Sequence, residues 1–199
     1  MHTEEPSLPP DGRAPRHPYV GLTARARQGV LIGAVVVLVG ALVGLAVTAP
    51  ALMTPLAPGG IVSWQLAGSG AEVAAILAEW GPEGRAAARA NLLVDLAFAP
   101  AYGLVIGLVA VRLGVSLGRR RPAAGMADTT AWAALLAALA DLAENALMLS
   151  VLAVGPSDGL ATATRTLALL KFALLGLALV LLLGLAVLRW RARASGEGS

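Results

Sequence analysis

The chain of 199 residues contains no cysteine, and its two histidines, His2 and His17, both lie near the N-terminus. The lack of cysteine excludes disulfides, thiol nucleophiles, iron–sulfur clusters and zinc–thiolate sites. Because neither histidine lies in an apolar segment, we expect no histidine-based metal site and no Ser-His-Asp triad inside the fold. The sequence therefore predicts neither a metal nor a cofactor.

Charged residues are also scarce, since they make up 14% of the chain while hydrophobic residues make up 57%. A soluble domain has about 25% charged residues, so this balance, together with long apolar runs, indicates an integral membrane protein. The basic residues are fourteen Arg and one Lys, and the net charge is +3. Most arginines lie beside the apolar runs and are not interleaved with aromatic residues, so no nucleic-acid partner is expected.

Four long apolar segments predict four transmembrane helices, at about 29–50, 91–113, 130–154 and 163–188. About 20 apolar residues are enough for a helix to cross a bilayer. The first segment is longer than the apolar region of a signal peptide, which has about 7–15 residues, so we interpret it as a retained helix. The sequence thus predicts an all-α polytopic membrane protein, with one four-helix bundle over residues 29–190.

The segments on either side of this bundle are polar. Residues 1–28 mix proline with charges of both signs and show no apolar period in their first part, which predicts a disordered tail. Residues 191–199 form a second predicted tail.

A short external amphipathic helix is predicted over residues 69–80, between the first two spans. Ser69 and Glu72 have the spacing of a capping box, and the pair Gly81-Pro82 ends the helix. Its apolar face consists of residues at i, i+3, i+4 and i+7, namely Val73, Ile76, Leu77 and Trp80. This helix either lies on the membrane surface with its tryptophan at headgroup level or caps the mouth of the bundle, and the sequence leaves both alternatives open.

The arginines predict how the helices are threaded. Eleven lie before the first span, around the loop between the second and third spans, or after the fourth, while three lie on the other side. Because positive residues favour the cytoplasmic side, both termini are expected in the cytoplasm, with residues 51–90 and 155–162 outside. The bias toward alanine, glycine, leucine and arginine indicates a bacterium, and hence the bacterial cytoplasmic (inner) membrane.

Polar residues inside otherwise apolar spans are the most informative feature of the sequence. A charged acid at the centre of a span disfavours insertion by roughly 2.5–3.5 kcal/mol, so these residues need partners. Their spacing and depth place them in the outer half of the bundle, where we expect them to converge on one outward-facing pocket. The predicted pocket residues are Asp95, Tyr102, Asp141, Glu144, Asn145 and Lys171.

Lys171 is the predicted counter-ion of this pocket. A lysine–carboxylate contact at about 4 Å is worth roughly 4 kcal/mol before desolvation, which can hold one acid charged but not three. At least one of the three carboxyls is therefore expected to be protonated at neutral pH, unless Arg165 or Arg89 reaches it or a cation binds. We expect Glu144 to hold that proton.

Three interpretations of these residues are open. Ionisable residues within a membrane are candidates for a ligand, ion or proton site. A structural network, with Asp141–Lys171 and Asn145–Tyr102 bonds that fix the register of the helices, is the main alternative. Accidental tolerance of isolated acids is the third.

Glycines of the first span share one face of the helix as two G-x-x-x-G pairs. They are Gly29, Gly33, Gly40 and Gly44. Small residues let helix backbones approach closely in lipid, so this face is predicted to pack against another helix, although glycine is also common in membrane helices generally.

Five stretches carry a resemblance to a known family: IVSWQLAGSG, ILAEWGPEGR, NLLVDLAFAPAYGL, DLAENALML and LLKFALLGL. Over roughly residues 60–185 the chain resembles small bacterial four-helix integral membrane proteins, known mainly as hypothetical proteins, to which no activity is attached. The resemblance implies a four-helix fold in the bacterial inner membrane. The residues that match the family pattern are Trp80, Gly81, Asp95, Tyr102, Asp141, Glu144, Asn145 and Lys171.

These observations favour a binding or transport-associated membrane protein whose pocket takes a cation, a proton or a small polar group. The rival is a membrane enzyme that acts on a lipid or isoprenoid, with Glu144 or Asp141 as general acid and Lys171 as electrostatic support. A structural or accessory subunit that uses the glycine face is the third alternative. The expected partners are the lipid bilayer and either a second copy of the chain, as a homo-oligomer, or another membrane protein.

Overall fold

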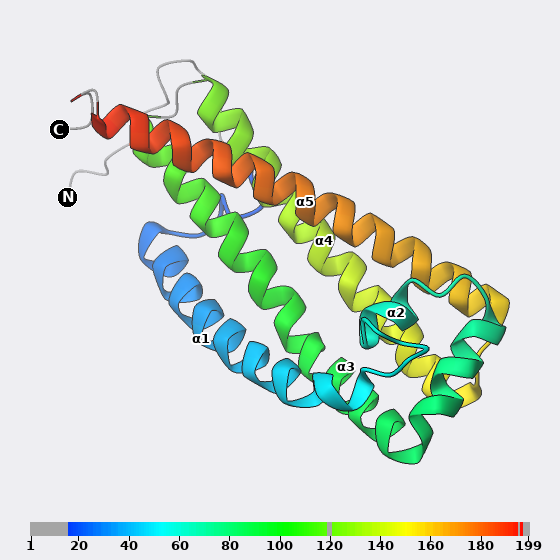
Figure 1. Cartoon of the computed structure of the whole chain (residues 1–199). Coiled ribbons are helices and arrows are strands. Elements are labelled where there is room, and N and C mark those ends of the chain that lie inside the picture. Colours follow the sequence, from blue (N-terminus) through cyan, green and yellow to red (C-terminus); the bar gives the residue numbers. More distant parts are fainter. Residues whose placement is uncertain (1–15, 119–120, 195, 197–199) are drawn as a thin grey trace.

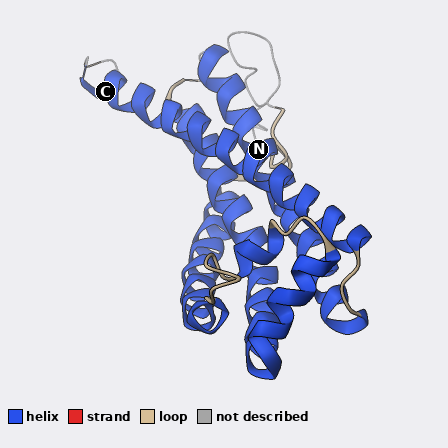
Figure 2. Ribbon diagram, turned by 45° about the vertical axis from the view of Figure 1, so that its right-hand side comes forward, coloured by secondary structure: helices blue, strands red, loops and turns tan. Residues whose placement is uncertain are grey.

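The computed structural model describes residues 16–118, 121–194 and 196, and within these ranges the chain forms helices and loops but no strands (Figures 1 and 2). Four helices are long and apolar enough to cross a membrane, which confirms the predicted all-α polytopic fold. They are α1 (Ala24–Thr48), α3 (Gly70–Ser116), α4 (Arg121–Val154) and α5 (Asp158–Ala194). Two short helices, η1 (Ala49–Leu52) and α2 (Ile61–Gln65), lie in the connection between α1 and α3.

Successive long helices run antiparallel and pack in sequence order: α1 on α3, α3 on α4, and α4 on α5 (Figure 1). The start of α1 and the end of α5 lie at one end of the bundle, which we call the terminal end. The connections over residues 49–69 and 155–157 lie at the opposite end, the distal end. The most apolar stretches of α3 and α4 are 39% and 44% buried, against 11% for α1 and 17% for α5. Hence α3 and α4 form the centre, and α1 and α5 flank it.

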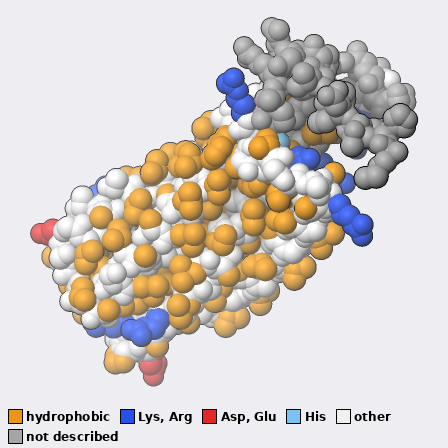
Figure 3. All heavy atoms as spheres, turned by 180° about the vertical axis from the view of Figure 1, so that it is seen from behind, with side chains coloured by type: hydrophobic (Ala, Val, Ile, Leu, Met, Phe, Trp, Pro, Cys, Tyr) orange, Lys and Arg blue, Asp and Glu red, His pale blue; other side chains and the backbone are white. Residues whose placement is uncertain are grey.

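The outer surface of the bundle is mostly apolar along its length. In Figure 3, hydrophobic side chains cover the body of the molecule, and the charged side chains on that face lie toward its two ends. This distribution matches a bundle whose middle is surrounded by hydrocarbon and whose ends reach polar surroundings.

Small residues bring α3 and α4 into close contact. A Cβ at Gly103 would lie 2.9 Å from the Cβ of Ala138 and 3.1 Å from the carbonyl oxygen of Ala134. Toward the terminal end, a Cβ at Gly114 would lie 2.7 Å from the Cβ of Ala127. In lipid, close van der Waals packing of this kind is a main source of attraction between helices. The α3–α4 pair is therefore the frame on which the polar side chains are held.

A sharp kink divides α3 at Gly81, whose φ of 59° and ψ of −165° leave the helical region. Glycine alone adopts this region readily. The predicted helix over residues 69–80 is present as the first limb of α3, with Ser69 accepting a hydrogen bond from the backbone N–H of Glu72 at 3.2 Å. The second limb, residues 82–116, runs through the bundle.

The first limb of α3 caps the distal end of the bundle. The Trp80 side chain is buried, its indole N–H donates to the carbonyl oxygen of Leu52 at 2.9 Å, and its ring meets Trp64 edge-on with centroids 5.9 Å apart. Of the two alternatives left open by the sequence, the structure supports the cap, because the tryptophan packs inside the protein. The cap joins residues of several elements, including Leu52, Ala57, Trp64, Val73, Ile76, Leu77, Trp80, Met148 and Val151.

The chain before α1 folds against the bundle from Arg16 onward. The backbone N–H of Arg16 donates to Asp128 Oδ2 at 3.0 Å, and the Trp132 indole donates to the Arg16 carbonyl oxygen at 2.6 Å. The predicted disordered tail over residues 1–28 is therefore wrong from residue 16 onward, and residues 1–15 lie outside the described part of the chain.

Tyr19 anchors this segment in the bundle. Its side chain is buried, its hydroxyl lies 3.4 Å from the carbonyl oxygen of Gly103, and its ring occupies the space where a Cβ of Gly107 would lie. Burial raises the pKa of Tyr19 to about 12, so the hydroxyl stays protonated and can donate across the physiological pH range. The buried Tyr19 ring thus helps to hold in place a segment whose content of proline and charged residues predicted disorder.

The long helices extend past the apolar runs that predicted them. α4 begins at Arg121, not near residue 130, and α5 ends at Ala194, not near residue 188, so the second predicted tail is helical at its start. Apolar runs mark only the part of a helix that needs an apolar environment, whereas flanking alanine and arginine residues continue the helix because they are good helix formers. Residues 195 and 197–199 lie outside the described part of the chain.

Candidate functional site

Lys171 forms two buried ion pairs between α5 and α4. Its Nζ lies 3.0 Å from Asp141 Oδ1 and 2.8 Å from Glu144 Oε2. Asp141 and Glu144 are three residues apart on one face of α4, so a single ammonium reaches both carboxyls. All three residues are buried, and the predicted contact between Lys171 and Asp141 is present.

Asn145 links this pair of helices to α3. It lies one turn beyond Asp141, is fully buried, and donates through Nδ2 to Asp95 Oδ2 at 2.7 Å. The Asn145–Tyr102 bond expected for a structural network is not formed, because the amide donates to the carboxylate instead. The structure thus joins five predicted residues into one charged cluster, consisting of Asp95, Asp141, Glu144, Asn145 and Lys171.

Tyr102, the sixth predicted residue, lies beside this cluster without completing a hydrogen bond. Its hydroxyl is buried near Asp141, and the described residues offer it no partner of hydrogen-bonding geometry. Glu144 Oε1 and Asn145 Oδ1 also lack a hydrogen bond within that part of the chain. Buried polar atoms are usually satisfied. Of these groups, the Tyr102 hydroxyl lines a cavity and could take a hydrogen-bond partner there.

The charges of the cluster do not balance when all its acids are ionised. Three carboxyls face one ammonium, and no other lysine or arginine among residues 16–118 and 121–194 forms an ion pair with them. Arg165 lies instead near Gly68 and Glu72, and Arg89 lies on a separate surface. The surplus of two negative charges needs protons or a cation, since isolated charges are costly in a low-dielectric interior.

A cavity of about 480 Å³ opens beside the charged cluster. Its polar floor comes from α3, α4 and α5, its walls from the apolar side chains of α1, α3 and α5, and its roof from η1, α2 and the loop between them. The floor includes Asp95, Tyr102, Asp141 and Lys171. The other two predicted residues, Glu144 and Asn145, do not line the cavity and contact it only through their partners. We call this space the distal cavity.

Two further polar residues of the distal cavity, Gln65 and Asn91, were not among the predicted pocket residues. Gln65 is buried in α2, and Asn91 donates through Nδ2 to Thr48 Oγ1 at 2.7 Å, which ties α3 to the end of α1. Asn91 shares a helix face with Asp95 and was detectable from that spacing. Gln65 carried no such signal, because the segment around it shows no apolar period.

The predicted glycine face of α1 is largely unoccupied by the rest of the chain. A Cβ at Gly29, Gly33 or Gly40 would meet no atom within 4 Å, whereas one at Gly44 would lie 3.0 Å from Val94. Only Gly44 therefore allows close packing within the described structure. At the other three glycines, the described chain does not cover the face of α1. The packing of that face against a partner helix remains a prediction.

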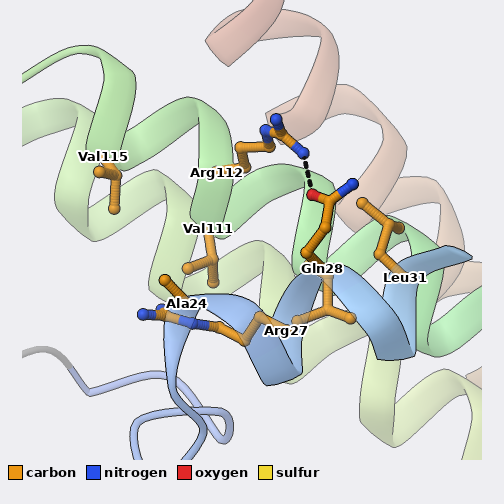
Figure 4. A pocket seen from close by; sticks show the side chains of 8 residues that line it. Ala24, Arg27, Gln28, Leu31, Val111, Arg112 and Val115 are labelled. Carbon is orange, nitrogen blue, oxygen red and sulfur yellow. Dashed lines mark hydrogen bonds between the residues drawn. The ribbon is translucent and has the colours of Figure 1, made fainter.

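A second cavity of about 330 Å³, the terminal cavity, lies between the first turns of α1 and the last turns of α3. Figure 4 shows Arg112 of α3 reaching toward Gln28 of α1, to whose Oε1 it donates, while Arg27 extends away from that pair. The other residues that line the terminal cavity are apolar or small. Here the charged side chains are exposed or half-buried, and they lie at an end of the bundle.

Comparisons with known proteins leave these residues without a precedent. No family model matches the chain, and neither curated proteins nor solved structures give a match. The function therefore has to be inferred from the geometry of the charged cluster and its cavity.

Proposed function

We propose that this protein is a membrane-embedded binding protein whose distal cavity takes a small cation or a cationic group. The proposal rests on the observation that acids of the charged cluster line the distal cavity. Asp95 and Asp141 line the floor, while the positive charge of Lys171 is already engaged by Asp141 and Glu144. An incoming positive charge would therefore meet a net negative floor, and attraction across a low-dielectric site is strong.

The arrangement of the acids favours an organic ammonium over a bare metal ion. Among the described residues, no three acidic or histidine side chains gather closely enough to hold a metal. An ammonium group instead donates up to three hydrogen bonds, and Asp95, Asp141 and the Tyr102 hydroxyl all line the cavity as acceptors for them. A bound cation would also neutralise a negative charge that a proton otherwise neutralises. We assign that proton to Glu144.

The membrane and the direction of threading belong to the same proposal. Eleven of the fourteen arginines flank the spans on the side of the terminal end, and positive residues favour the cytoplasm. We place the protein in a bacterial cytoplasmic membrane with both termini inside. The distal cavity then lies in the outer half of the bilayer.

Calorimetric titration of the detergent-purified protein with ethylammonium chloride tests the proposal, with sodium chloride as the comparison salt. The wild-type protein should give saturable binding of ethylammonium, and Asp95→Asn should weaken it at least tenfold, because a neutral amide removes the attraction to the ammonium charge. Glu83→Gln is the matched control, since Glu83 is an exposed acid outside the cavity. The affinity of the Glu83→Gln variant for ethylammonium should stay within twofold of wild type.

The outcome also separates binding from a structural network. Saturable binding that depends on Asp95 but not on Glu83 supports a ligand site. If ethylammonium does not bind to the folded wild-type protein, and substitution of Asp95 or Asp141 only destabilises it, the cluster is a device for holding the helices together. Helicity and thermal unfolding measured on the same samples report the folded state.

A further inference from the structure

The distal cavity combines a charged floor with apolar walls. On α1 it is lined by Leu42, Leu45 and Ala46, and on α5 by Phe172 and Leu175. A site for a water-borne ion has no need of apolar walls on two helices. Pockets for larger ligands, in contrast, are mostly apolar with a few polar groups that fix orientation, and have volumes of about 300–1,000 Å³.

The roof of the cavity is packed in part, although its lining residues Met53 and Val62 are 61% and 39% exposed. Leu52, Ala57 and Trp64 of the roof are almost completely buried, and Trp80 packs against them. These side chains join the cap formed by the first limb of α3. This packed part of the roof narrows access to the cavity from the polar surface above.

The side of the cavity, between α1 and α5, is different. Both helices pack on α3, and they are not extensively packed on each other. Large apolar side chains of the cavity lining are exposed on both helices, with Leu42 of α1 49% and Phe172 of α5 40% exposed. In a membrane bundle, an opening surrounded by exposed apolar residues faces lipid, because hydrocarbon solvates such side chains and water does not.

Resting on the function proposed above, we infer that the ligand is a single-chain cationic amphiphile that enters from the membrane between α1 and α5. Its ammonium head binds at Asp95 and Asp141, and its hydrocarbon chain extends past Leu42 and Leu175 toward the lipid. The negative floor selects the sign of the head group. The apolar walls select a ligand that arrives through the bilayer, where it is concentrated relative to water.

The Tyr102 hydroxyl and the amides of Gln65 and Asn91 complete the recognition of the head. All three line the same cavity as the acids, and hydroxyl and amide groups both accept and donate. A hydroxylated ammonium head would therefore find partners for its hydroxyl group as well as for its charge. A fully alkylated head would leave these groups unsatisfied.

Native mass spectrometry of the full chain released from nanodiscs tests the inference with two probes that share a head group. Ethylammonium carries the head alone, and dodecylammonium adds a twelve-carbon chain. Dodecylammonium should bind as one saturable copy, at least tenfold more tightly than ethylammonium, and Asp95→Asn should remove both complexes. The dependence on Asp95 distinguishes this copy from amphiphile that is merely dissolved in the surrounding lipid.

Substitutions at the side opening test the route. Leu42→Trp should weaken dodecylammonium at least tenfold more than it weakens ethylammonium, because the larger ring fills the space for the chain. Val43→Trp is the matched control, since Val43 is the next residue, is exposed, and does not line the cavity. Ala46→Leu provides a milder obstruction if the tryptophan variant does not fold.

The failures of the two proposals are distinguishable. If ethylammonium binds through Asp95 but the long chain gives no advantage, or if Leu42→Trp and Ala46→Leu leave dodecylammonium binding unchanged, the site takes a water-borne cation and the lateral route is wrong. If neither amine binds to the folded wild-type protein, the proposed function itself is wrong.

Discussion

Two cavities lie against α1, one near each of its ends, and α3 contributes to both. In the distal cavity the acids are Asp141, which is buried and paired with Lys171, and Asp95, which is half-buried. In the terminal cavity the charges are arginines that remain exposed or half-buried. The difference teaches that a charge inside the bundle depends on a partner supplied by the protein, whereas a charge at the end of the bundle is stabilised by water and headgroups. Loss of the partner should therefore lower the free energy of unfolding strongly only for a charge inside the bundle.

Lys171→Met should give the largest effect. It leaves Asp141 and Glu144 without their cation, and removal of one partner of a buried ion pair costs about 3–5 kcal/mol. The measurement is the free energy of unfolding in mixed detergent micelles. The loss should shrink as the pH is lowered, because protonated acids no longer need the ammonium. A variant as stable as wild type at neutral pH would show that the cluster is hydrated, and the contrast between the cavities would disappear.

Asn145→Leu should rank second. The substitution removes the amide that donates to Asp95, and a buried acceptor left without its donor costs about 1–3 kcal/mol. Asn91→Leu is the matched control, since that amide donates to the uncharged Thr48 hydroxyl. Asn91→Leu should lower the free energy of unfolding by less than Asn145→Leu does in the same assay. Equal losses would indicate that the charge of Asp95 adds nothing to the bond.

Tyr102→Phe should separate stability from binding. Its hydroxyl has no hydrogen-bond partner among the described residues, so the free energy of unfolding should change by less than about 0.5 kcal/mol. The affinity for ethylammonium should fall, by up to about tenfold, because one ligand hydrogen bond is lost. A destabilised variant with unchanged affinity would mean that the hydroxyl serves the fold and not the site.

Arg112→Met should have the smallest effect. The bond from Arg112 to Gln28 lies at an exposed position of the terminal cavity, where a polar contact is worth less than about 1 kcal/mol. Unfolding in detergent and ethylammonium titration should both remain close to wild type. A loss as large as that of Lys171→Met would show that the arginine is as dependent on its partner as the buried lysine.

The elements that were predicted well share one physical signal. Apolar runs long enough to cross a membrane identified all four long helices, because burial in hydrocarbon restricts composition over many consecutive residues. Asp141, Glu144 and Lys171 stood out for the opposite reason, since charges in such runs are rare and need partners. Their helix faces and compatible depths were enough to predict the contact between Lys171 and Asp141, whereas the second contact, with Glu144, was not predicted.

The parts that were missed depend on single contacts. The buried Tyr19 ring and the two backbone hydrogen bonds of Arg16 hold the segment before α1 on the bundle, and composition averages over such individual contacts. Gln65 reaches the cavity because the loop before it turns through Gly60 at a positive φ of 58°. The glycines of α1 illustrate a further limit, because a spacing defines a helix face but not which neighbour covers it.

The kink at Gly81 makes one helix responsible for two tasks. The limb before it supports the roof of the distal cavity, and the limb after it carries Asp95 and Tyr102. A methyl group at position 81 would meet no atom within 4 Å, so Gly81→Ala would change only the backbone torsional preference, by about 1–3 kcal/mol. Alanine disfavours the positive φ of the kink without a steric clash at the roof or the floor. The substitution should therefore change the angle between the two limbs of α3.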